Sequence, residues 1–267
     1  MHKMKLSKTI FDFRNLIVFL LLIFTFTTLS AYELTGLVDV PTAGIIERGD
    51  VKFNSTLFKN GGVTFGAGVG ILPKLMFGIQ YGGEKIIGSR TPSWDSYPGV
   101  FVKYRLIDES PKLPALSVGF DSRGYGCYTK ETEDSVKVER YEIKSKGFYA
   151  VLSQNYELMG NLGVHAGINY SIENKDEDDD LNIFLGFDKS INNQIGLFFE
   201  YDFAFNDNDA QGDEEKYKFG EQNGYLNAAF YFNVSQNLKL EVNFRDLLGN
   251  QYNNPDRSIT LKYSAKI

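Results

Sequence analysis

The sequence predicts an all-β protein, folded as a closed antiparallel transmembrane β-barrel of about 12 strands after a cleaved signal peptide. Three observations support this prediction. The chain begins like an exported protein, its remainder alternates apolar and polar residues with a period of two, and the predicted connections between strands alternate in length.

The first 31 residues have the composition of a secretory signal peptide. A start with four basic residues precedes a charge-free stretch over residues 15–31, and the small residues at its end favour cleavage after Ala31. A permanent membrane anchor is the alternative, but the strongly apolar run over 16–24 is shorter than the roughly 20 residues that a bilayer core requires. We therefore expect a signal peptide at 1–31, an N-terminal periplasmic or plug segment at 32–47 and a barrel at 48–267.

Alternation dominates the chain after Asp50. In the run at 63–71, for example, Val63, Phe65 and Val69 fall on one face, whereas Thr64 and three glycines fall on the other. Such alternation is typical of strands, and no part of the mature chain shows a sustained helical period. Runs bounded by turn residues predict strands over 50–58, 62–71, 74–83, 97–107, 113–123, 146–157, 160–172, 179–190, 193–205, 222–233, 236–247 and 257–267. Many of them match the roughly 9 to 11 residues with which a tilted strand crosses a bilayer.

Alternation alone does not distinguish a soluble β-sandwich from a membrane barrel, because both segregate apolar and polar faces. Loop length favours the barrel. Five of the six predicted outer loops are long, the exception being the Asn-Gly turn at 59–62, and the turns at the opposite end are mostly short. The last strand alternates up to Ile267 and resembles the C-terminal strand that the outer-membrane assembly machinery recognises, with isoleucine in place of the usual final aromatic residue.

Charge and cysteine content exclude several classes of function. Removing residues 1–31 takes four basic residues from 28 and one acidic residue from 34, leaving 24 against 33 and a net charge of −9. Nucleic acid is therefore not an expected partner, because its binding requires a basic face. A single cysteine excludes an intramolecular disulfide and a multi-cysteine zinc site. The acidic loop at 207–218 starts like a calcium-binding loop but has Lys218 where a bidentate glutamate is needed, so we expect a solvated loop and no metal site. Loose contact with Ca²⁺ or Mg²⁺ near anionic surface sugars is the minor alternative, and no cofactor is expected.

The predicted inward face carries charges of both signs, diluted with glycine. These charges either brace a narrow barrel through crossing ion pairs, which we favour, or line a hydrated passage and tune its selectivity. Twelve strands lie between the eight that side chains fill and the roughly 16 that leave a wide channel. The lumen-lining candidates are Lys103, Arg105, Asp121, His165, Asp188, Glu200, Asp202, Glu241, Arg245 and Lys262.

Catalysis has little support in the sequence. His165 is the only histidine of the mature chain, so it would be the only imidazole base for a serine or cysteine nucleophile. It falls on the predicted lumen face, away from lipid, and a hydrogen-bonded structural histidine is the simpler interpretation. We therefore predict no catalytic residues.

The stretch GLVDVPTAG at 36–44 precedes the first strand and contains Pro41, which lacks the backbone donor that an interior barrel strand needs. We expect it to pack at the periplasmic mouth or to fold back into the lumen. It also resembles the opening of the YjbH-like family of outer-membrane barrels linked to exopolysaccharide production. The residues that carry this resemblance are Gly36, Leu37, Pro41, Thr42 and Ala43.

The resemblance implies a non-enzymatic outer-membrane barrel, here a single short module, that assists export or anchoring of a surface exopolysaccharide. A small passive channel or a structural envelope protein is the alternative. The expected location is the outer membrane of a Gram-negative bacterium. The expected partners are outer-membrane lipid and lipopolysaccharide, the assembly machinery and a polysaccharide.

Overall fold

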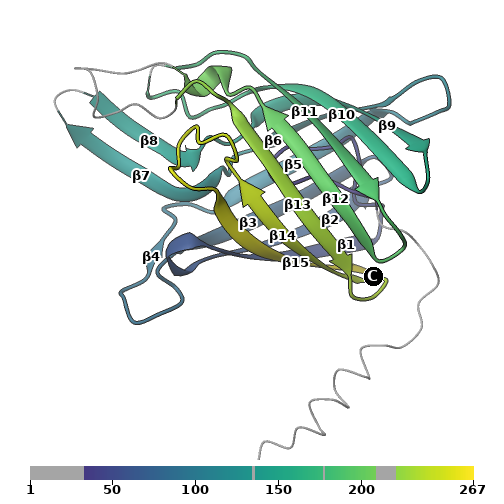
Figure 1. Cartoon of the computed structure of the whole chain (residues 1–267), viewed down its shortest axis with the longest axis horizontal. Helices are drawn as coiled ribbons and strands as arrows, with labels where there is room; N and C mark the ends of the chain where they lie inside the picture. The colour runs from purple at the N-terminus through teal and green to yellow at the C-terminus, as the bar shows by residue number, and fades with distance from the viewer. Residues whose placement is uncertain (1–32, 134–135, 177, 209–220) are drawn as a thin grey trace, which may run out of the picture. The chain divides into compact units, whose positions relative to one another are not determined.

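Twelve antiparallel strands close into a barrel in the computed structural model, which describes residues 33–133, 136–176, 178–208 and 221–267. The expected signal peptide at 1–31 lies outside these residues. The barrel strands are β1 Asp50–Phe58, β2 Gly62–Leu72, β3 Leu75–Glu84, β5 Gly99–Ile107, β6 Ala115–Asp121, β9 Gly147–Glu157, β10 Asn161–Tyr170, β11 Asn182–Ser190, β12 Ile195–Asp202, β13 Tyr225–Asn233, β14 Leu238–Arg245 and β15 Asp256–Lys266. Each pairs with the next in this order, and β1 pairs with β15 to close the ring (Figure 1).

The predicted strand positions and the predicted alternation of loop lengths are confirmed. The connections at the end where β15 finishes are short, and the opposite end carries the long segments. The outer β1–β2 connection is the predicted tight turn, built on the 3-10 turn Lys59–Gly61, in which Asn60 and Gly61 take left-handed φ values of 58° and 68°. Asparagine and glycine tolerate that conformation best, so the sequence reverses the chain there in few residues.

The segment at 124–145, expected to be an outer loop, contains a hairpin of β7 Tyr125–Glu133 and β8 Val136–Ile143. These two strands pair only with each other, and in Figure 1 they project beyond the end of the barrel opposite the C-terminus. One more short strand, β4 Ser93–Trp94, pairs with the end of β3. Charged residues interrupt the apolar periodicity of β7 and β8, which is why the pattern predicted a loop.

The polarity of the two faces identifies the barrel's solvent. On β11, Ile183, Leu185 and Phe187 point outward and are 39%, 45% and 42% exposed, whereas Asn182 and Asp188 on the other face are buried. The same reversal of a soluble protein's pattern recurs around the ring, with large apolar side chains outside and polar ones buried inside. Because such an outer face is stable only in contact with lipid, the barrel spans a membrane. No helix in the described part of the chain is long and apolar enough to cross one.

Candidate functional site: the barrel lumen and the segment inside it

Most of the residues that precede β1 lie in the lumen: residues 34–46 are buried or half-buried, whereas Glu33, Glu47 and Arg48 are exposed. Leu37, Val40 and Ala43 are almost fully buried and pack into an apolar cluster with Phe184, Phe198 and other inward residues of β6, β9, β11, β12 and β13. The segment makes a tight turn in which the Leu37 amide donates to the Val40 carbonyl over 3.0 Å, between Gly36 and Pro41. Its local shape therefore follows from the two residues that the sequence singled out, since glycine and proline favour turns.

Glu200 on β12 binds the tip of this turn. Its carboxylate accepts the backbone amides of Val38 at 2.9 Å, Asp39 at 2.9 Å and Val40 at 3.1 Å. The side-chain amide of Asn227 on β13 donates to the same carboxylate over 2.8 Å. Three successive backbone N–H groups that converge on one carboxylate form an anion-binding concavity, so the turn and Glu200 are complementary.

Arg245 at the end of β14 holds the same turn from the other side. Its Nε lies 2.9 Å from the carboxylate of Asp39, and its Nη1 donates to Ser258 over 2.6 Å. The guanidinium also lies over the ring of Tyr125, 3.7 Å from the ring centroid. Arg245 thus connects the N-terminal segment with β15 and with the base of the outer hairpin.

Lys103 and Arg105 on β5 bind the part of the segment nearer to β1. The Lys103 ammonium donates to the carbonyls of Thr35, Thr42 and Gly44 over 2.7, 2.8 and 3.0 Å. Arg105 forms an ion pair with Glu33 and donates to the Ala43 carbonyl. These cations satisfy buried carbonyls that the irregular backbone cannot pair within a sheet.

Ala43 and His165 meet at one serine. The Ala43 amide donates to Ser153 Oγ over 2.8 Å, and Ser153 Oγ lies 2.8 Å from His165 Nδ1. His165 Nε2 lies 3.0 Å from a carboxylate oxygen of Asp188. Both ring nitrogens are therefore used in a buried chain of hydrogen bonds that ends on the N-terminal segment.

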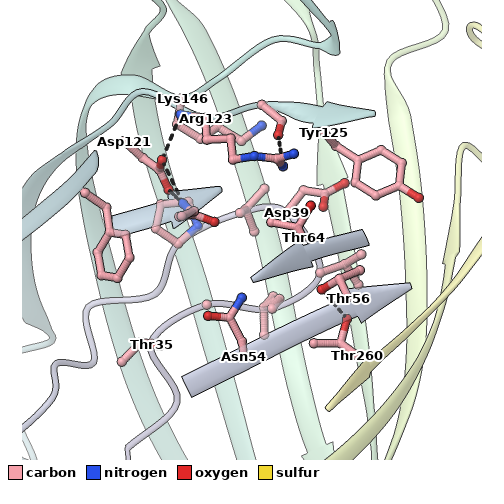
Figure 2. Close-up of a pocket in the computed structure, with 18 of the residues that line it drawn as sticks. Thr35, Asp39, Asn54, Thr56, Thr64, Asp121, Arg123, Tyr125, Lys146 and Thr260 are labelled. Atoms are coloured by element: carbon pink, nitrogen blue, oxygen red, sulfur yellow. Dashed lines mark hydrogen bonds between the residues drawn. The ribbon is translucent and has the colours of Figure 1, made fainter. Parts of the chain in front are cut away.

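A polar cavity of about 250 Å³ remains beside the segment (Figure 2). Threonine and amide side chains line its middle, and Thr56 and Thr260 share a hydrogen bond of 3.0 Å. Asp121 lies toward the outer end, where Gln80 donates to it over 3.2 Å and the Arg123 backbone amide donates over 3.0 Å. Lys52 and Lys262 lie nearer the periplasmic end. The segment thus fills one side of the lumen and leaves a cavity, lined by both polar and apolar side chains, on the side of β1, β2, β3 and β15.

Buried ion pairs crowd the outer end of the lumen. Arg140, on β8 of the hairpin, contacts Asp176 at 2.9 Å and Asp207 at 2.5 Å, and Lys144 contacts Asp176 at 2.7 Å. These acids come from the two neighbouring outer loops, so the cluster connects three loops. Glu173 accepts the amides of Tyr141 and Ser145, and burial raises the pKa of Glu173 to about 7.

The ten lumen-lining candidates all lie on the inner side of the wall, in three groups. Glu200, Arg245, Lys103, Arg105 and, through Ser153, His165 contact the N-terminal segment. Asp188 bonds His165, and Asp202 is paired with Lys146. Asp121, Glu241 and Lys262 line the cavity.

Sequence reasoning did not single out Lys52, Lys144 or Arg140. The alternation of the first strand could have placed Lys52 inside the barrel, together with Asn54 and Thr56, because these residues alternate with apolar or outward ones. Arg140 lies in the hairpin that was expected to be a loop. The acidic loop that starts like a calcium-binding loop is described only in part, because residues 209–218 lie outside the described residues.

The closed ring, its apolar exterior and its polar interior define an outer-membrane β-barrel of a Gram-negative bacterium. Residues 28–131 match the family model YjbH, described as exopolysaccharide biosynthesis protein YbjH. The resemblance based on residues 36–43 is thereby confirmed over a part of the chain that includes the lumen segment and β1 to β6. No curated protein matches the sequence.

Several solved barrels are similar to this chain. The KdgM porin is 8% identical, with 80% of this chain and 98% of that chain covered and a TM-score of 0.47. The outer membrane protein Omp33 of Acinetobacter baumannii is 10% identical, with 82% and 97% covered and a TM-score of 0.42. The translocator domain of the autotransporter NalP from Neisseria meningitidis is 12% identical, with 82% and 86% covered and a TM-score of 0.34. All three similarities are remote in sequence and in superposition.

Proposed function

We propose that this protein is a non-enzymatic barrel that assists export or anchoring of a surface exopolysaccharide, and that residues 33–47 act as a plug in its lumen. The observation that carries the proposal is the convergence of three backbone amides of the segment on Glu200. Charged side chains on opposite walls of the barrel, Glu200, Arg245 and Lys103, are used to hold this one segment, and simple bracing of the wall does not require that arrangement.

The exopolysaccharide part of the proposal is supported by the family match, whose residues 28–131 include the plug. The polar cavity beside the plug supports it in a second way. Its side chains of threonine, asparagine and glutamine present hydroxyl and amide groups at the spacing of a strand face, and such groups hydrogen-bond to sugar hydroxyls as readily as to water.

A gated passive channel is the second candidate, and the charged and polar side chains that line the cavity beside the plug favour it. Under this alternative the plug regulates ions or small solutes, and no glycan is involved. A purely structural barrel would need neither the plug nor the cavity.

Two measurements separate these candidates. Deleting the gene is expected to lower the exopolysaccharide displayed or released by the cells, and the full-length gene should restore it. A variant lacking residues 33–47 should fail to restore normal amounts although it still reaches the outer membrane and shows heat-modifiable migration on a gel. Unchanged exopolysaccharide in the deletion strain, together with increased ion conductance of the plug-deleted barrel in planar bilayers, would favour the passive channel instead.

A further inference from the structure

The periplasmic half of the cavity is unusually rich in lysine. Lys52 on β1 and Lys262 on β15 both line it, and they are diagonal neighbours on the inner face because Lys52 pairs with Ser264 and Asn54 with Lys262. Lys239 on β14 lies directly opposite Lys262. Like charges placed opposite each other on neighbouring strands destabilise a sheet, so this arrangement costs stability unless an anion is present.

The carboxylates in the described part of the chain do not balance these cations. Glu241 lies 2.7 Å from Lys262. Lys52 has no carboxylate within ion-pair distance among the described residues, and its ammonium donates to Thr35 Oγ1 over 3.0 Å. Lys239 is directed elsewhere, with its ammonium 4.7 Å from the ring centroid of Tyr231. In the periplasmic half of the cavity, the carboxylate of Glu241 therefore faces the two cations Lys52 and Lys262. A low-dielectric wall strengthens the attraction of this place for an anion.

Glu241 adds a second kind of binding group. The residue is 1% exposed, and its Oε1 has no hydrogen-bond partner in the described part of the protein. A buried carboxylate oxygen without a donor is costly, so a ligand that brings a hydroxyl or another donor to it would be favoured. Asn54, Thr56 and Thr260 surround the same space with further polar groups, and Phe101 offers an apolar face.

Taken together, these groups match a ligand that carries both a carboxylate and several hydroxyl groups. We propose that the lumen cavity binds a carboxylated sugar unit of an acidic glycan, with its carboxylate at Lys52 and Lys262 and one of its hydroxyls donating to Glu241 Oε1. The Lys262 side chain remains 20% exposed, so its ammonium is accessible from the cavity. This inference rests on the proposed function, because it names the chemical class of the polysaccharide.

Isothermal titration of the detergent-solubilised full mature chain tests the site. The probes are tetramannuronate, an acidic tetrasaccharide, the neutral maltotetraose and inorganic phosphate. We expect tetramannuronate to bind at least about tenfold more tightly than either of the other two probes. Lys52→Gln and Lys262→Gln should each weaken tetramannuronate binding by about tenfold, the effect of losing one charge-assisted hydrogen bond. Lys112→Gln, the same charge change in an exposed periplasmic turn, should bind like the unaltered protein.

Equal binding of the acidic and neutral tetrasaccharides, or unchanged binding by both lumen variants, would overturn the proposal. Phosphate binding as tight as tetramannuronate binding would replace it with a general anion site. Heat-modifiable migration of each variant verifies that the barrel has folded. The binding test and the test of the proposed function can fail separately. If the purified barrel binds tetramannuronate but deleting its gene leaves the exopolysaccharide unchanged, the binding site stands and the export role is refuted.

Discussion

Replacing Glu200 with alanine should release the plug. The substitution removes the acceptor for the amides of Val38, Asp39 and Val40, of which the Val40 amide is buried and the other two are partly buried. A buried donor left unsatisfied costs about 1 to 3 kcal/mol, and water entering the vacated space favours the lower end, so three donors cost about 3 kcal/mol. The charged neighbours keep partners, because Lys146 remains paired with Asp202 and Arg245 with Asp39.

A shift of about 3 kcal/mol changes the ratio of unplugged to plugged barrels by roughly a hundredfold. We expect Glu200→Ala to show correspondingly more frequent openings in planar bilayers than the unaltered protein, and its plug segment to be cleaved faster by added protease. Glu200→Gln should have a smaller effect. Its remaining carbonyl oxygen can take the place of Oε2, which accepts the amides of Val38 and Val40, while the contact of Oε1 with Asn227 is lost.

Glu109→Ala is the matched control. Its carboxylate also accepts several hydrogen bonds, from Gln154 and from the backbone and side chain of Asn155, but it lies in a periplasmic turn outside the lumen. It should leave conductance and plug cleavage unchanged. If folded Glu200→Ala behaves like Glu109→Ala in both assays, the three amide contacts do not hold a plug, and the reasoning is wrong.

Three further outcomes follow from the structure. Lys103→Met should lower the thermal unfolding temperature and weaken attachment of the plug, because three carbonyls lose their donor. The free energy of unfolding should fall by about 2 to 4 kcal/mol, as measured by urea unfolding in lipid vesicles. Leu185→Arg, on the outward face of β11, should cost about 2 to 4 kcal/mol in the same assay, and an unchanged stability would contradict contact of this face with lipid. Burial raises the pKa of Glu173 from 4.5 to about 7, so the contribution of Glu173 to the stability of the outer-loop cluster should be greatest below pH 4.5. This contribution should fall by up to about 3 kcal/mol as pH rises through 7. Hydrogen exchange of the 141–145 amides should show this pH dependence, and Glu173→Gln should abolish it.

The barrel was predictable because its main determinant is local. A period of two places every side chain on one of two faces, and the twelve runs needed only turn residues to separate them. Alternation left open the choice between a membrane barrel and a soluble sandwich. The structure decides it, because the polar side chains are buried and the apolar ones face outward. The hairpin β7–β8 was missed because its strands pair only with each other, and charged residues interrupt the alternation along their sequence.

The site was only partly predictable, because alternation identifies the face of a residue but not its partner. Glu200 could be placed inside the barrel from the sequence, yet its contact with Val40 joins positions 160 residues apart. Lys103 was one of several inward cations, and nothing local indicated that it would bind three carbonyls of a segment before the first strand. Such contacts depend on closure of the ring and on the path of the N-terminal segment.

Departures from the polar-inside pattern explain why the plug lies where it does. Phe184, Phe198 and Tyr231 are large apolar side chains that project into the lumen, and all three belong to the neighbouring strands β11, β12 and β13. A water-filled lumen would leave these rings hydrated, whereas Leu37 and Val40 cover them and gain apolar burial. The opposite wall has a smaller apolar surface, where Met76 and Phe101 pack against Ile45 and Ile46. Elsewhere it presents threonine, asparagine and lysine to the cavity. The inward residues of β11, β12 and β13 therefore form the main apolar docking wall of the lumen, and the sequence around Leu37 and Val40 is complementary to it.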